Sequence, residues 1–135
     1  ALELRDFSGN FGNMQIANDL GANYTSDLNY TAWQNATRLF LSQHPETNVI
    51  IWSWCWQHNT IEANINTYLS MMNQLEQDFP GVKFVYMTGH VNLESPCPSG
   101  NTCLRNKQIR DYVTANNKIL YDFSDIESWD PDGNF

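Results

Sequence analysis

Three short apolar segments, separated by helix-like segments, constrain the fold of this chain more than any other feature of its sequence. Residues 48–54 are nearly all apolar and rich in β-branched and aromatic side chains, and residues 82–88 and 118–123 resemble them. Apolar runs of this length are typical of strands that are covered on both faces of a sheet. The sequence therefore predicts three buried strands.

The segments around these strands have the periodicity of helices. Apolar side chains recur at three- and four-residue spacing from Ile61 to Phe79. Residues 59–62 carry the short polar side chain and following glutamate of an N-terminal cap, and Pro80 with Gly81 ends the pattern. Two further helices are predicted, over about residues 31–43 and about residues 104–116.

Strands that alternate with helices through short connections predict parallel strands joined by right-handed crossovers. We therefore expect one α/β domain over residues 1–135, with three α/β/α layers around a mainly parallel sheet. Residues 1–30 are rich in Gly, Asn and Asp and are expected to be irregular, apart from a short strand at Leu2–Leu4. Because three strands make a small sheet, further strands are expected from Leu2–Leu4, from sequence upstream or from a neighbouring chain. The chain is compatible with the C-terminal part of a longer one.

Charge and hydropathy exclude two classes of partner. Fifteen Asp and Glu against seven Lys and Arg give a formal net charge of −8, whereas binding to a phosphate backbone needs a basic stripe. No apolar run approaches the roughly 18 residues of a membrane span. We expect neither a nucleic-acid partner nor a membrane span. No charged leader with an apolar core is present, so any secretion signal is expected outside this chain.

Cysteine and asparagine patterns both point to export. Cys97 and Cys103 enclose a turn-rich loop, which predicts a disulfide and an oxidising compartment. Free thiols or half of a metal site are the alternatives, although no second Cys/His pair has zinc spacing. Three N-x-[ST] triplets, at Asn23, Asn29 and Asn35, predict N-glycosylation, with chance in an Asn- and Thr-rich chain as the alternative. An extracellular or cell-surface location follows from these expectations.

Candidate catalytic residues follow the strands, because ligands of open parallel sheets bind beyond the carboxyl ends of the strands. His90 follows a glycine at such an end and is suited to proton transfer near neutral pH. Asp122 or Asp125 would orient it, as the acid of a triad does, and Gln57 or a backbone N–H would donate a hydrogen bond to an oxyanion. A structural hydrogen bond within the loop is the alternative role for His90.

Cys55 is a candidate nucleophile beside His58 or His90. The alternative is an inert buried thiol, which is the commoner role of a cysteine between two tryptophans.

Near the C-terminus, four carboxylates stand within eight residues: Asp125, Glu127, Asp130 and Asp132. Hard oxygen ligands at alternating positions suit Ca²⁺, which is the one cofactor that the sequence suggests. A solvated acidic turn is the alternative, because Pro-Asp-Gly is an ordinary turn sequence.

Residues 48–57, 84–90 and 120–133 together resemble a group of large exported bacterial and archaeal proteins that is related to the SGNH/GDSL hydrolases. The resemblance covers roughly residues 32–135 and implies a flavodoxin-like, SGNH-like α/β/α fold, an extracellular setting and hydrolysis of esters. The chain departs from the hydrolase pattern in lacking a Gly-Asp-Ser block after the first strand and an Asp-x-x-His block near the end. Trp56 stands where the group has glycine.

Three functions are compatible with these features. The first is an exported ester hydrolase that acts on carbohydrate esters and requires no cofactor. The second is a non-catalytic, glycosylated structural or filament-forming subunit that self-associates through a hydrolase-like fold. The third is a Ca²⁺- or glycan-binding module, which rests on the acidic tail and on the alternating Trp52, Trp54 and Trp56. The alternative role of these tryptophans is packing in the core.

Overall fold

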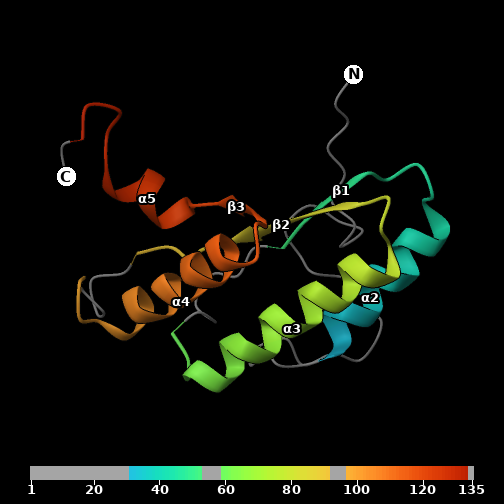
Figure 1. The fold of residues 1–135 in the computed structure, drawn as a ribbon, viewed down its shortest axis with the longest axis horizontal. Coiled ribbons are helices and arrows are strands. Elements are labelled where there is room, and N and C mark those ends of the chain that lie inside the picture. The colour runs from blue at the N-terminus through green and yellow to red at the C-terminus, as the bar shows by residue number, and fades with distance from the viewer. Residues whose placement is uncertain (1–30, 53–58, 92–96, 134–135) are drawn as a thin grey trace.

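Strands and helices alternate along the part of the chain that the structure describes, which is residues 31–52, 59–91 and 97–133 of a computed structural model (Figure 1). The elements are α2 (Thr31–Gln43), β1 (Val49–Ile51), α3 (Glu62–Asp78), β2 (Lys83–Met87), α4 (Asn101–Ala115), β3 (Ile119–Tyr121) and α5 (Phe123–Ser128). The predicted α/β class is confirmed.

The described strands form one parallel sheet in the order β1-β2-β3. With this order, right-handed crossovers place both connecting helices on the same face of the sheet. α3 packs against β2, α4 packs against β2 and β3, and α2 packs against α3. These three helices accordingly lie on one side of the strands (Figure 1).

The two faces of the sheet differ in burial along the outer strands β1 and β3. Ile50, Phe84 and Tyr86 point towards the helices and are at most 3% exposed. On the other face, the exposed fractions are 47% for Val49, 45% for Ile51, 47% for Ile119 and 42% for Tyr121, whereas Val85 of the central strand is half-buried and Met87 is buried. The expectation that every strand is covered twice is therefore not met within the described residues, and the three-layer arrangement is not confirmed. An apolar run shows that a segment is hydrophobic, but it does not show which parts of the protein cover each face of the strand.

The core lies between the sheet and the three helices. Ile65, Tyr68 and Met72 of α3 are fully buried there, because apolar side chains at three- and four-residue spacing share one helix face. Trp52, which follows β1, packs edge-on against Trp33 of α2 with ring centroids 5.5 Å apart. Trp52 is thus part of the core packing.

Two predicted helix starts are displaced in the structure. α3 begins at Glu62, after Ile61, and Thr60 accepts a hydrogen bond from the Asn64 side chain instead of capping the helix backbone. α4 begins at Asn101, three residues before the predicted start. The side-chain amide of Asn101 donates to the Thr60 carbonyl at 2.8 Å and so fixes this first turn against the segment before α3.

The third strand is shorter than predicted. β3 ends at Tyr121, and Phe123 already begins α5, a helix that the sequence did not predict. Its backbone starts with hydrogen bonds from the amides of Asp125 and Ile126 to the Asp122 carbonyl.

Cys97 and Cys103 are joined in a disulfide with Cα atoms 5.5 Å apart, which is the pairing that the sequence predicts. The bond ties the loop before α4 to the first turn of that helix. Within the described residues, no helix combines the length and apolarity needed to cross a membrane.

The core assignment predicts a contrast between two isoleucines. Ile65→Ala removes a side chain with no exposed surface and should lower the free energy of unfolding by about 2–5 kcal/mol, because it leaves a cavity. Ile61→Ala removes a side chain that is 65% exposed and should change it by about 0.5 kcal/mol or less. Urea denaturation measures both values, and equal losses would contradict the assignment.

Candidate functional site

The candidate site lies at the carboxyl edge of the sheet, where β2 and β3 end side by side. Met87 and Tyr121 are register partners in these two parallel strands. The next residues, Thr88 and Asp122, therefore meet, and the Thr88 hydroxyl donates to Oδ1 of Asp122 at 3.0 Å. The ends of the strands are joined through side chains as well as through the backbone.

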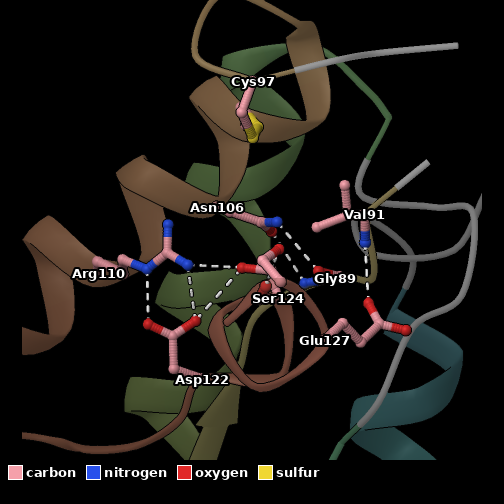
Figure 2. The surroundings of a disulfide bond; sticks show 10 residues. Gly89, Val91, Cys97, Asn106, Arg110, Asp122, Ser124 and Glu127 are labelled. Atoms are coloured by element: carbon pink, nitrogen blue, oxygen red, sulfur yellow. Dashed lines mark hydrogen bonds and ion pairs between the residues drawn. A yellow bond between two sulfur atoms is a disulfide. The ribbon is translucent and has the colours of Figure 1, made fainter. Parts of the chain in front are cut away.

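An ion pair with α4 dominates this edge (Figure 2). Nε of Arg110 donates to Oδ2 of Asp122 at 2.6 Å, and Nη2 donates to Oδ1 at 2.8 Å. The same Nη2 also donates to Oγ of Ser124 at 2.5 Å. A two-pronged guanidinium–carboxylate pair fixes the angle between its partners as well as their separation. Arg110 therefore orients both the end of β3 and the start of α5.

The pKa values of Asp122 and Arg110 reflect both their partial burial and their hydrogen bonds. Burial alone raises the pKa of Asp122, but the hydrogen bonds from Arg110 and Thr88 and the charge of Arg110 outweigh it and hold this pKa below its usual value. The hydrogen bonds that Arg110 donates to Asp122 raise the pKa of Arg110 in turn. Both side chains are charged at neutral pH.

Asp122 was predicted from the sequence to orient His90, and the contacts of its carboxylate do not assemble that arrangement. Both oxygens accept from Arg110, and Oδ1 also accepts from Thr88 and Ser124. A carboxylate that is held by a guanidinium stabilises the fold, whereas a triad acid must bond to imidazole. These contacts of Asp122 are structural, and its predicted role beside His90 stays a prediction.

His90 is half-buried in the loop of residues 88–91, which we call the His90 loop. Its Nδ1 lies 2.9 Å from the carbonyl oxygen of Val91. Because a carbonyl only accepts, this hydrogen bond requires a proton on Nδ1. In the neutral ring, Nε2 is then the basic nitrogen.

Side chains from two helices hold the residues on either side of His90 (Figure 2). Asn106 of α4 accepts from the Gly89 amide at 2.9 Å and donates to the Gly89 carbonyl at 3.0 Å. Glu127 of α5 accepts from the Val91 amide at 2.9 Å. The His90 loop is thus fixed on both sides of the histidine.

Arg110 and Asn106 are the residues that sequence reasoning missed. Asn106 shares the buried face of α4 with Ile109 and Val113, at three- and seven-residue spacing. A polar residue on a buried stripe needs hydrogen-bond partners, so the periodicity contained a signal for Asn106. Arg110 lies beside that stripe, and no local pattern marks its pairing with a residue twelve positions away.

The predicted calcium ligands lie on or after α5 and are dispersed. Asp125 and Glu127 are exposed on the helix, and Asp130 accepts from the Asp132 amide at 3.0 Å in a local turn. Within residues 31–52, 59–91 and 97–133, no three His, Cys, Asp or Glu side chains are grouped to hold a metal ion. Calcium binding stays a prediction.

One of the remaining predicted residues lies within the described part of the chain, and the others lie outside it. Asn35 is exposed on α2, while Thr37 of the same triplet is buried and donates to the Trp33 carbonyl at 2.8 Å. Residues outside the described ranges are Cys55, Gln57, Asn23, Asn29, His58, Trp54 and Trp56.

Comparisons with known proteins give no relative for this chain: no family model, no curated protein and no solved structure matches it. The resemblance to SGNH/GDSL hydrolases therefore stays a prediction.

The ion pair predicts a pH-dependent loss of stability in Asp122→Asn. A carboxyl whose pKa is lowered by folding stabilises the protein above its unfolded value of about 3.9, and this stability is lost as pH falls through the folded pKa. Asp122→Asn should lower the free energy of unfolding by about 1–3 kcal/mol at pH 7. The difference from the unsubstituted protein should shrink below about pH 4.

Asp111→Asn is the matched control, because it removes the partner of Lys107 in a pair whose side chains are 64% and 67% exposed. An exposed pair of this kind contributes about 0.5 kcal/mol or less. Urea denaturation between pH 3 and pH 7 compares the two variants. A loss in Asp122→Asn that does not vary with pH would contradict the assignment.

Proposed function

We propose that this chain forms part of an exported ester hydrolase with an SGNH-like α/β/α fold, and that His90 is its general base. One observation carries the proposal: Nδ1 of His90 is bonded to the Val91 carbonyl, which makes Nε2 the basic nitrogen at the carboxyl edge of a parallel sheet. The Cys97–Cys103 disulfide fits an oxidising extracellular compartment.

The chemistry needs His90 to accept one proton in each half of the reaction. Nε2 takes the proton from the nucleophile as that group attacks the ester carbonyl, and returns it to the leaving alcohol as the acyl-enzyme forms. It then takes a proton from the water that attacks the acyl-enzyme, and returns it to the nucleophile as the acid is released. The Val91 carbonyl holds the ring in the required tautomer, which is the task that the sequence assigned to a carboxylate. The predicted nucleophile Cys55 and oxyanion donor Gln57 lie outside the described residues. The proposed substrates are esters, including acetyl groups on glycans, and no cofactor is required.

Hydrolysis of p-nitrophenyl acetate and of acetylated glycans tests the assignment. His90→Ala should lower kcat/KM by about 100-fold or more, because a positioned base contributes about 10²–10⁴-fold. His44→Ala is the control, since His44 follows α2 and contacts Phe40, with ring centroids 4.4 Å apart. Absence of hydrolysis by the unsubstituted protein, or equal activity in both variants, would contradict the proposal.

A second candidate function, a non-catalytic subunit that self-associates, is favoured by the open face of the sheet. Val49, Ile51, Ile119 and Tyr121 of this face are 42–47% exposed. Parallel sheets are found almost only with both faces covered, so this face is suited to be an interface.

We propose a second copy of the chain as the occupant of that face, on grounds of charge. Alternation along the described strands places Lys83 on this face and no Asp or Glu. Copies that each carry a net charge of −8 approach with least repulsion where carboxylates are absent.

Light scattering over a range of protein concentrations tests self-association. The mass should rise above that of a monomer, and Ile51→Lys should return it to the monomer. Leu39→Lys is the control on α2, since Leu39 and Ile51 are each 45% exposed. A monomeric mass at every concentration, or an equal effect of both variants, would contradict the second function.

A further inference from the structure

We infer that Asn106 and Glu127 are positioning residues, which hold the His90 loop so that His90 keeps its Nδ1–H tautomer. The inference deepens the proposed function and rests on His90 as its base. It assigns neither side chain to contact with the substrate.

Asn106 fixes the loop before the histidine. It is 1% exposed, and its amide bonds to both the N–H and the C=O of Gly89, at 2.9 and 3.0 Å. One side chain therefore satisfies both backbone polar groups of a buried residue that lies beyond the end of β2. Rotation of either peptide next to Gly89 would break one of these bonds and leave a buried polar group unpaired. Asn106 therefore holds the backbone on the N-terminal side of His90.

Glu127 fixes the loop after the histidine. Its carboxylate accepts from the Val91 amide at 2.9 Å, while the Val91 carbonyl accepts from Nδ1 of His90 at 2.9 Å. Val91 is thus held at its N–H by α5 and uses its C=O to hold the ring. A carboxylate acceptor makes the first of these bonds stronger than a neutral acceptor would.

Hydrogen bonds to other elements hold α5, the helix that carries Glu127. The Ser124 amide at the start of α5 donates to the Thr88 hydroxyl at 3.0 Å, and Oγ of Ser124 accepts from Arg110. α5 is therefore tied to the end of β2 and to α4, which also supplies Asn106. The hydrogen bonds on both sides of His90 thus depend on α4, which supplies Asn106 directly and holds α5, the helix that carries Glu127, through Arg110. These bonds restrain the loop and therefore the orientation of the ring.

The test uses the surface residue Glu127, because truncation of the buried Asn106 would also disturb the core. ¹⁵N NMR of the histidine rings in the full chain reports which ring nitrogen carries the proton, whether or not the protein turns over an ester. The unsubstituted protein should show His90 mainly as the Nδ1–H tautomer. Glu127→Ala should shift it towards a mixture, and Glu127→Gln, which keeps an acceptor oxygen, should restore it.

Asp111→Ala, which removes an exposed carboxylate from α4, is the control and should leave the His90 signals unchanged. If the protein hydrolyses esters, Glu127→Ala should also lower kcat by about 10-fold with little change in KM, since misplacement of a base affects the chemical step. A predominant Nε2–H tautomer in the unsubstituted protein, or unchanged His90 signals in Glu127→Ala, would overturn the inference. A retained Nδ1–H tautomer without hydrolysis would contradict the proposed function and support the positioning role.

Discussion

The ion pair between Arg110 and Asp122 is the interaction on which the carboxyl edge of the sheet depends. It joins α4 to the end of β3, and through Thr88 and Ser124 it reaches β2 and α5. The side chains of Arg110 and Asp122 are 36% and 27% exposed, so the charges lie in a partly buried environment. Such charges are stable only when they are paired and well hydrogen-bonded, and this requirement fixes the relative positions of four elements.

The position of His90 depends on the same network. Thr88 precedes the loop and is bonded to Asp122, while α5 brings Glu127 against Val91. The carboxylate of Asp122 is paired with Arg110, and Nδ1 of His90 is bonded to the Val91 carbonyl. The same network thus holds Asp122 and fixes the backbone on both sides of His90.

The alternation of strands and helices was predictable because burial imposes periodicity on the sequence, as the buried stripe of Ile65, Tyr68 and Met72 shows. Element ends were less predictable. The early start of α4 depends on a bond from Asn101 to Thr60, and the start of α5 at Phe123 interrupts a run that reads as strand.

The side-chain partners of the site were the least predictable part. Arg110 meets Asp122 because a helix returns antiparallel beside the strand that follows it, and only tertiary packing sets that register. The exposed face of the sheet was not predictable from the sequence for a related reason. Val49 and Ile51 are as apolar as Ile50, so composition alone predicts burial for all three.

Carbon-detected NMR of the Asp122 carboxyl during a pH titration tests the central role of the ion pair most directly. The pairing with Arg110 predicts a midpoint below the value of about 3.9 that is usual for aspartate, because the carboxylate form accepts hydrogen bonds from Arg110 and Thr88 and is attracted by the charge of Arg110. A midpoint at or above that value would show that Asp122 is not held by Arg110 in solution. The carboxylate would then again be a candidate to orient His90.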